Sequence, residues 1–204
     1  MEFYEAVARR RTVREFRADP VFGEVVSRVL EAGLRAPSNA HLKPWQFVLL
    51  RDPEKRRRAV VEGLRARDMK DGAEIERFLE GFTDETLKRV YRRSLPAQLT
   101  MMLEAPELLV VCYKMKPLAE CHTLFGLNPL ASVWMCIENI MLAMAAEGLY
   151  GCTYTPYDAA GLKTALGIPP GWEVAAVIPF GYPKTVPGPN DAEDLDRRLH
   201  VDVW

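Results

Sequence analysis

The chain has 204 residues, of which 49% are hydrophobic and 27% charged, a composition typical of a globular protein and not of a disordered one. A chain of this length buries enough surface to form its own core, so it needs neither disulfides nor a structural metal. The formal net charge is −1, from 27 basic and 28 acidic residues. A general nucleic-acid-binding domain would carry a basic surplus, so the near-zero charge argues against this class while leaving room for local basic patches.

The four cysteines indicate thiols in a reducing compartment, and we expect the protein to be cytoplasmic. No two of them form a C-x-x-C pair, and three histidines are too few to complete zinc-finger sets, so no metal site is predicted. Residues 1–5 hold two acids and no apolar run, so we expect no signal peptide there.

The predicted elements alternate between helices and short strands. Apolar residues at helical spacing predict a helix over 22–35, which ends before Pro37 because the residue before proline avoids the helical region. Asp52-Pro53 begins another helix, with proline in its first turn. The other predicted helices cover 2–10, 129–149 and the stretch between Asp158 and Gly167, and the predicted strands cover 45–50, 107–113, 152–155 and 173–180.

Residues 54–104 form the most charged part of the chain and show helical patterning without a strong β run. We interpret 60–104 as a helical excursion that leaves the main core and acts as a lid. The run Arg56-Arg57-Arg58 just before it is typical of a solvated helix face. The chain shows no internal repeat and no linker, so residues 1–204 are expected to form one α/β or α+β domain of four or more strands.

The helix predicted over 129–149 is apolar on nearly every side. It contains Glu138, Asn139 and Glu147, which would be costly in lipid, so we expect a buried helix and not a membrane span. A single small domain rarely surrounds such a helix completely. The pattern therefore predicts a dimer interface along it.

Common catalytic motifs are missing from the sequence. It contains no G-x-G-x-x-G after a strand, no G-x-x-x-x-G-K-[ST], no H-E-x-x-H and no G-x-S-x-G. The clearest candidate site is Arg10-Arg11-Thr12-Val13-Arg14, where three guanidiniums and one hydroxyl lie beside a helix end. Guanidinium groups pair well with phosphate oxygens, although a solvated basic helix end shows the same pattern.

Three weaker features accompany this cluster. The loop over 36–45 contains two prolines and presents Ser38, Asn39 and His41, either as a binding loop or as an ordinary capped turn. The stretch over 148–156 contains two glycines and two threonines that lie two apart on a strand, and hence on one face. The pair Arg197-Arg198 is either a further phosphate contact or plain surface charge.

Taken together and in order, these features resemble the FMN-dependent nitroreductase family. They are Arg10-Arg11-Thr12-x-Arg14-x-Phe16, Ala-Pro-Ser-x-x-x-x-x-Pro-Trp ending at Trp45, Gly-Leu before a Thr-x-Thr-Pro strand, and Phe180-Gly181-Tyr182-Pro183 followed by a basic tail. The stretches 36–45 and 153–183 are most similar to the iodotyrosine-deiodinase branch. The resemblance implies an α+β (α/β sandwich) nitroreductase-like fold, with a central mixed, mainly antiparallel sheet flanked by helices.

It also implies a domain-swapped homodimer with two FMN sites, each built from both chains, in which the C-terminal extension over 184–204 wraps the partner subunit. Arg10, Arg11 and Thr12 would hold the FMN phosphate and ribityl chain. Arg14 would reach the ribityl chain or the N1–C2=O edge of the flavin, where a fixed cation stabilises the negative charge left by reduction.

The remaining roles are divided between the two subunits. Thr153 would lie near N5 of the flavin, and Thr155 would support the ring. The partner subunit would supply residues that line the flavin, and His41 in the same loop favours the deiodinase branch because many nitroreductases have Asn there. The lining residues are Pro37, Ser38 and Asn39. One of Arg197 and Arg198, with Arg197 preferred, would close over the phosphate. No side chain is expected to act as a catalytic acid or base.

The implied activity is that of an FMN-dependent oxidoreductase using NADH or NADPH by a ping-pong mechanism. Its acceptor would be a small aromatic molecule such as a nitroaromatic, a quinone, another flavin or a halogenated phenol. Two alternatives stay open: a reductive dehalogenase or flavin-fragmenting enzyme on the same fold, and a flavin-binding protein without turnover. Residues 60–100 lack the Glu-x-x-x-Tyr by which the deiodinase branch clamps an amino-acid zwitterion, which argues against a halotyrosine substrate.

Overall fold

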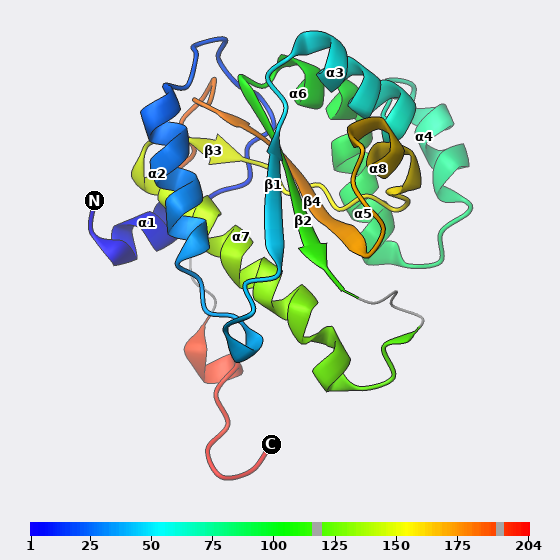
Figure 1. Ribbon diagram of the computed structural model, residues 1–204. Helices are drawn as coiled ribbons and strands as arrows, with labels where there is room; N and C mark the ends of the chain where they lie inside the picture. Colours follow the sequence, from blue (N-terminus) through cyan, green and yellow to red (C-terminus); the bar gives the residue numbers. More distant parts are fainter. Residues whose placement is uncertain (116–119, 191–193) are drawn as a thin grey trace.

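A four-stranded sheet lies between two layers of helices in the computed structural model, which describes residues 1–115, 120–190 and 194–204 (Figure 1). The strands are β1 (Trp45–Leu49), β2 (Glu107–Lys114), β3 (Tyr150–Gly151) and β4 (Trp172–Gly181). Their order is β1-β2-β4-β3, and all three pairings are antiparallel. The expected α+β fold with a mainly antiparallel sheet is confirmed. An isolated bridge between Thr12 and Gly151 adds a parallel contact.

Strand β2 shows why the sheet is covered on both faces. Every residue of β2 except the last is buried. Because successive side chains of a strand point to opposite faces, Leu109 and Val111 enter one apolar cluster, while Leu108 and Val110 enter another. The continuous apolar run of this strand is the pattern expected of a strand buried on both sides.

The first helical layer consists of α2 (Gly23–Leu34) and α7 (Asn128–Ala146), with α1 (Phe3–Arg9) lying against α7. Gly33 allows α2 to approach α7 closely, because a Cβ at this position would lie 2.6 Å from a side-chain atom of Ile140. The predicted helices over 2–10, 22–35 and 129–149 are confirmed to within a few residues. Gly148, at a φ of 72°, follows the end of α7.

Helix α7 forms much of the core in this layer. By length and composition alone, Leu124–Ala146 could cross a membrane. In the structure, however, Val133, Ile137 and Ile140 are at most 1% exposed and belong to the cluster formed with α2 and the sheet. The opposite side of α7 is partly open, and Trp134 and Met135 are 36% and 40% exposed. The helix is therefore not enclosed on every side within one chain.

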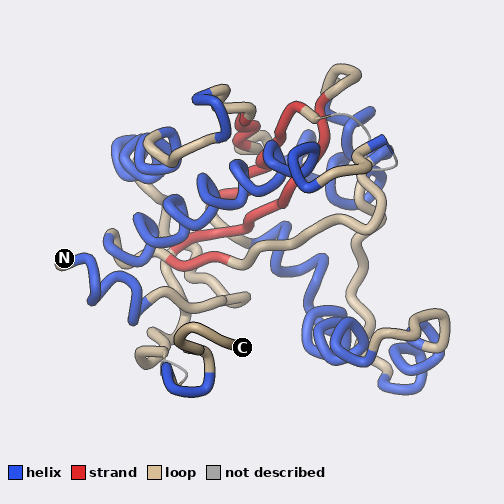
Figure 2. The backbone as a smooth tube through the Cα atoms, turned by 90° about the horizontal axis from the view of Figure 1, so that it is seen from below, coloured by secondary structure: helices blue, strands red, loops and turns tan. Residues whose placement is uncertain are grey.

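The second layer contains α3 (Pro53–Arg57), the π-helix η2 (Arg58–Gly63), α6 (Gln98–Glu104) and α8 (Ala160–Leu166). Between η2 and α6 the chain forms α4 (Gly72–Leu79) and α5 (Glu85–Ser94), which lie to the right of the sheet in Figure 1 and away from the strands in Figure 2. This excursion has a small apolar cluster of its own. The buried members of that cluster are Met69, Ile75, Leu79 and Leu95.

Two local predictions were wrong. A strand was expected over 152–155, but β3 is Tyr150–Gly151. The N–H of Cys152 donates to the carbonyl of Pro179, which has no N–H to return, so the ladder is interrupted until Tyr154 bridges Val177.

The second wrong prediction concerns Arg56, which was expected on a solvated helix face but is only 8% exposed. Its guanidinium donates hydrogen bonds to the carbonyls of Leu50, Ala105 and Pro106. Arg57 and Arg58, the other residues of this run, are exposed as expected. The buried position follows from where α3 begins, beside the end of β1 and the entry to β2. Helical periodicity does not reveal these carbonyls, because that of Leu50 lies before the helix and those of Ala105 and Pro106 come from a segment 49 and 50 residues later.

Short 3₁₀ helices lie between the longer elements or follow them. They are η1 (Asn39–His41), η3 (Leu95–Ala97), η5 (Leu124–Leu127) and η6 (Leu195–Arg197). The helix predicted between Asp158 and Gly167 is confirmed. Its N-cap residue is Ala159, and a carboxylate oxygen of Asp158, one residue earlier, accepts a hydrogen bond from the N–H of Ala160 at 2.8 Å. Gly167 ends this helix in the left-handed conformation, also as predicted.

Candidate functional site

The basic segment 10–14 leaves α1 in an extended form and runs beside β3. The N–H of Val13 donates to the carbonyl of Gly151 at 3.1 Å, next to the bridge that Thr12 makes with the same residue. Alternate residues of an extended segment point to opposite sides, so Val13 packs against the core while Thr12 and Arg14 point the other way. The sheet edge thus fixes the direction in which these polar side chains point.

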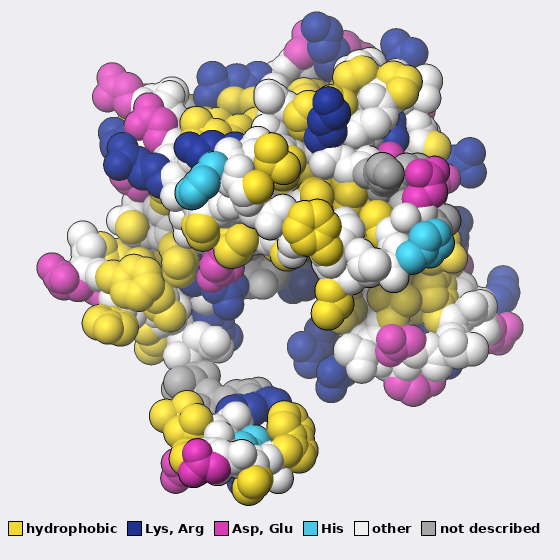
Figure 3. Space-filling view, turned by 60° about the horizontal axis from the view of Figure 1, so that its bottom comes forward, with side chains coloured by type: hydrophobic (Ala, Val, Ile, Leu, Met, Phe, Trp, Pro, Cys, Tyr) yellow, Lys and Arg dark blue, Asp and Glu magenta, His cyan; other side chains and the backbone are white. Residues whose placement is uncertain are grey.

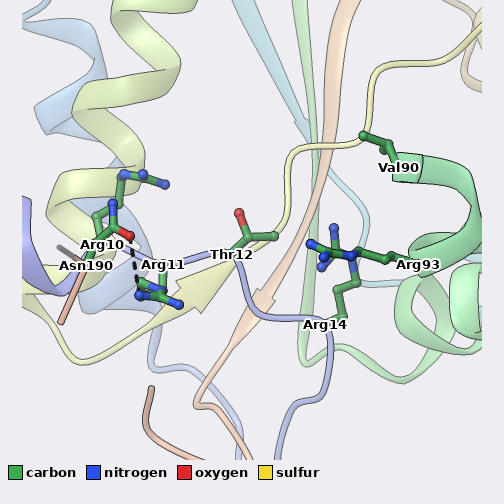
Figure 4. A pocket seen from close by; sticks show the side chains of 7 residues that line it. All are labelled: Arg10, Arg11, Thr12, Arg14, Val90, Arg93 and Asn190. Carbon is green, nitrogen blue, oxygen red and sulfur yellow. Dashed lines mark hydrogen bonds between the residues drawn. The ribbon is translucent and has the colours of Figure 1, made fainter. Parts of the chain in front are cut away.

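A pocket of about 440 Å³ opens over this segment. It is lined by Arg10, Arg11, Thr12, Arg14, Val90, Arg93 and Asn190 (Figure 4). Four of these seven residues are arginines, and none of the lining residues is acidic. Figure 4 shows the side chain of Arg93 extending from α5 toward Arg14. Such an excess of guanidinium groups makes the pocket suited to a polyanionic ligand such as a phosphate ester.

Two of the arginines are oriented by contacts behind the pocket. Arg10 Nε lies 3.5 Å from an oxygen of Glu138 on α7. Arg11 Nη1 donates to the carbonyl of Pro189 at 3.1 Å and to Asn190 Oδ1 at 3.3 Å. The backbone N–H of Asn190 in turn donates to the carbonyl of Ala8 at 2.7 Å. The start of the C-terminal segment therefore helps to build the pocket.

Arg14 contributes a buried side-chain donor to the pocket. Its Nε is buried and has no hydrogen-bond partner within the described part of the chain. A buried donor left without an acceptor costs about 1–3 kcal/mol. Nearby, burial raises the pKa of the Cys152 thiol, while the positive charge of Arg14 and a hydrogen bond between this thiol and the Arg14 side chain lower it. An anionic ligand in this pocket would supply the acceptor that Arg14 lacks.

The other predicted site residues lie elsewhere in the single chain. Thr155 lines a separate pocket together with Trp134 and Glu173, and Thr153, half-buried, is not among the residues that line the arginine pocket. Their proposed contact with the flavin ring stays a prediction.

The loop with Pro37, Ser38 and Asn39 lies against the start of α7, where the N–H of Asn39 donates to Ser132 Oγ at 3.1 Å. This loop is held in an unusual backbone conformation. Ala40, His41 and Lys43 have φ values of 50°, 56° and 43°. The left-handed region costs a residue other than glycine about 1–2 kcal/mol. Ser38 Oγ accepts a hydrogen bond from the N–H of Lys43 at 2.9 Å, which helps to hold the turn. His41 is exposed and does not line the arginine pocket.

The last part of the C-terminal extension, residues 194–204, stands off from the body of the chain, at the bottom of Figure 3. The side chain of Arg197 is 85% exposed, and its Nε lies 4.0 Å from Asp194. Within one chain, neither Arg197 nor Arg198 lines the arginine pocket. Their predicted contact with a phosphate can be made only in another arrangement of the segment or across a subunit interface.

Sequence reasoning did not identify Val90, Arg93 and Asn190 as residues of this pocket. Val90 and Arg93 are three residues apart on α5 and so share a helix face. The adjacent Arg92 pairs with Glu76 through two hydrogen bonds of 2.7 and 2.8 Å. Periodicity could have separated Arg93 from Arg92, but it could not show which pocket the Arg93 face would meet.

The family model described as "Nitroreductase family" matches residues 7–182. Among curated proteins, iodotyrosine deiodinase of Daphnia pulex is 27% identical over 91% of this chain, and iodotyrosine deiodinase 1 of Rattus norvegicus is 28% identical over 91%. The chain spans 61% and 65% of the length of these two proteins. NADH dehydrogenase of Thermus thermophilus is 25% identical over 98% of this chain and 94% of its own length.

Solved structures show the same fold at lower sequence identity. An iodotyrosine deiodinase bound to FMN and 3-iodo-L-tyrosine matches with a TM-score of 0.74 and 21% identity, over 95% of this chain and 96% of that one. An NADPH:FMN oxidoreductase of Vibrio harveyi in complex with NAD⁺ matches with a TM-score of 0.69 and 21% identity, over 99% of this chain and 77% of that one.

Proposed function

The chain belongs to the nitroreductase family, and we propose that it is an FMN-dependent oxidoreductase that takes electrons from NADH or NADPH and passes them to a small aromatic acceptor. The observation that carries the proposal is the arginine pocket at the edge of the sheet, with four guanidiniums and no acidic lining residue. The unpartnered Nε of Arg14 fits an anionic cofactor, because its donor needs an acceptor that the described part of the chain does not supply.

Different residues of this chain would contact different parts of the cofactor. Arg10, Arg11 and Thr12 would hold the phosphate and ribityl chain, since they share one end of the pocket and two of them are already oriented by neighbouring side chains. Arg14 would face the part of the flavin that gains negative charge on reduction. When bound, FMN supplies the electron transfer in both directions, from NAD(P)H and to the acceptor. The protein contributes binding, orientation and a fixed positive field.

The proposed site is completed by a second copy of the chain. A homodimer accounts for apolar side chains that one chain leaves exposed on α1, α7 and the C-terminal segment. They are Phe3, Tyr4, Trp134, Met135, Leu195, Leu199, Val201, Val203 and Trp204. In such a dimer the loop with Pro37, Ser38 and Asn39 would line the flavin of the partner, and Arg197 or Arg198 would reach a phosphate. The extension over 184–204 would then wrap the partner subunit.

The order of binding we propose is ping-pong, in which NAD(P)H and the acceptor occupy the same slot in turn. The helical excursion over 60–104 would act as the lid that selects the acceptor. Its placement supports this role, because Val90 and Arg93 on α5 line the arginine pocket. The proposed location is a reducing, cytoplasmic compartment. It is supported by Cys112, Cys136 and Cys152, which are free thiols buried in the structure.

The first experiment asks whether the purified protein carries FMN. We expect a yellow protein that releases FMN on denaturation. A colourless protein that stays colourless after soaking in FMN would refute the proposed function. The second step adds NADH or NADPH without oxygen, and we expect the flavin absorption to bleach with at least one of them.

A panel of acceptors then identifies the reaction. Reoxidation by nitroaromatics or quinones supports the main proposal. The similarity to iodotyrosine deiodinases supports one alternative, a reductive dehalogenase, which would consume a halophenol while nitroaromatics stay inert. Loss of the flavin itself during turnover would indicate a flavin-fragmenting enzyme. Bound FMN that neither nicotinamide bleaches would indicate a binding protein without turnover.

A further inference from the structure

A second pocket, of about 480 Å³, lies on the other side of α5 from Val90 and Arg93. Its walls come from the turn after η2, from α4 and α5, from the start of α6, and from the loop between β3 and α8. It is lined by Gly63, Leu64, Arg65, Arg67, Phe78, Phe82, Tyr91, Leu95, Gln98, Tyr154, Tyr157, Asp158 and Gly161. None of these residues lines the arginine pocket, so the proposed cofactor site leaves this cavity unexplained.

Five of the thirteen residues that line this cavity carry aromatic rings. The ring centroids of Phe82 and Tyr91 are 5.1 Å apart, and that of Phe78 lies 5.8 Å from Tyr91 in an edge-on arrangement. Tyr157 reaches the same group from the opposite side, 6.5 Å from Phe82. The guanidinium of Arg67 lies 5.6 Å from the ring centre of Phe78. Walls of this kind favour a flat ring, which stacks on or meets the edges of these side chains.

Gln98 is one of several polar residues of the wall, together with Arg65, Arg67 and Asp158. It is only 5% exposed, and its side-chain amide makes no hydrogen bond to any residue in the described ranges. Among the described residues, Arg14 Nε is the fully buried side-chain nitrogen or oxygen that lacks a partner, so the polar atoms of the Gln98 amide are not enclosed and stay open to the cavity that they line. The amide offers both a donor and an acceptor to whatever occupies the cavity. Tyr91 adds a hydroxyl, and its burial raises the pKa of that group, so it stays protonated at neutral pH.

We propose that this cavity is a second binding site, which takes a single-ring phenol with its ring between the aromatic walls and its hydroxyl on the amide of Gln98. A phenol satisfies both features at once, whereas a purely apolar ring would leave the amide unpaired. The site is separated from the arginine pocket by α5, whose residues Val90 and Arg93 face one pocket while Tyr91 faces the other. A bound phenol would therefore brace the helix that closes the cofactor pocket.

The test is calorimetric titration of 4-nitrophenol into the FMN-loaded protein in the absence of NAD(P)H, with toluene as the ring that lacks a polar group. We expect 4-nitrophenol to bind and toluene to bind more weakly. Gln98→Leu should weaken 4-nitrophenol binding roughly tenfold, the effect of about 1.4 kcal/mol for one buried hydrogen bond. Because Gln98 is buried, a second variant is needed that does not endanger folding.

Tyr157→Ala serves that purpose, since this side chain is 86% exposed yet forms one wall of the cavity. It should also weaken 4-nitrophenol binding several-fold, while Phe22→Ala, which removes an aromatic side chain that is 70% exposed on another part of the surface, should not. Failure of 4-nitrophenol to bind, or unchanged binding in both Gln98→Leu and Tyr157→Ala, overturns the proposal.

Repeating the titration on protein stripped of FMN separates this site from the proposed function. The cavity contains no residue of the arginine pocket, so we expect 4-nitrophenol to bind with or without FMN. Binding that disappears with the cofactor would place the phenol against the flavin and refute the second site. If the protein never binds FMN at all, the proposed function fails while the phenol titration still gives its own answer.

Discussion

Replacing Arg14 with Met should separate the binding role of this residue from its effect on stability. Met keeps most of the side-chain volume but removes the guanidinium, whose Nε is buried without a partner in the described part of the chain. In the protein without cofactor, loss of this unsatisfied donor should therefore stabilise the fold, by about 1 kcal/mol. For a chain of this length the gain corresponds to a rise in Tm of about 2–4 °C.

With FMN present the effect should reverse. A hydrogen bond from a charged donor contributes about 1.5–3 kcal/mol, and each 1.4 kcal/mol is a tenfold change in affinity. Arg14→Met should thus weaken FMN binding by about 10- to 100-fold. Quenching of FMN fluorescence during titration of the cofactor-free protein measures Kd, and thermal unfolding of the same sample measures stability.

The matched control is Arg57→Met, because Arg57 is exposed on α3 and lines neither the arginine pocket nor the aromatic cavity. It should leave both Kd and Tm unchanged. The reasoning is refuted if Arg14→Met has the same Kd as Arg57→Met, since Arg14 would then not contact the cofactor. A lower Tm of the cofactor-free Arg14→Met variant would refute the other half, because Arg14 would then be a stabilising core residue.

Three further changes test other parts of the structure. Gly161→Ala should destabilise the protein by about 1–3 kcal/mol in chemical unfolding, because the added Cβ would lie 2.5 Å from the carbonyl oxygen of Gly63 at the end of η2. Gly72→Ala is the control, since a Cβ there would meet nothing within 4 Å, and equal stability of the two variants would contradict the close approach. Glu147→Gln should cost less than about 1 kcal/mol at pH 7, since the hydrogen-bonded partner Arg28 lowers the pKa of Glu147 but both groups are partly solvated. A lowered carboxyl pKa contributes stability above the pKa of the unfolded state, about 4.3, and this stability is lost as pH falls through the pKa of the folded state. The denaturant midpoints of wild type and Glu147→Gln should therefore converge in acid. A difference between the midpoints that stays constant with pH would argue against the ion pair. Arg93→Met should weaken FMN binding by at most about tenfold, less so at high salt because the side chain is exposed, and a salt-independent Kd change would speak against an electrostatic role.

The sequence was sufficient for most of the fold because the main elements carry strong local signals. The strand ELLVVCY is apolar after its first residue, Glu107, and its structure is buried on both faces. The helix over 22–35 has an apolar stripe and stops before a proline. Where prediction failed, the cause lay in distant parts of the chain. Pro179 on β4 determines where β3 stops pairing. Arg56 is buried because its guanidinium binds the carbonyl of Ala105, 49 residues later, as well as that of Leu50, six residues earlier.

The site could be predicted only in part, for a similar reason. Arg10, Arg11, Thr12 and Arg14 are neighbours in sequence, so one extended segment brings them into one pocket. Arg93 reaches that pocket from a helix about 80 residues later, and no local pattern marks it. A different limit applies to the loop with Pro37, Ser38 and Asn39 and to Arg197 and Arg198. Their expected contacts with FMN depend on where another copy of the chain lies.

Arg56 also determines how the helical excursion over 60–104, the proposed lid, is attached to the sheet. Its guanidinium holds the carbonyl of Leu50, where the chain departs from β1, and those of Ala105 and Pro106, where it returns to β2. One cation thus fastens both ends of a long insertion between two neighbouring strands. The segment between these fixed ends could therefore be replaced by a differently shaped one that accepts another substrate, provided that the replacement keeps this arginine.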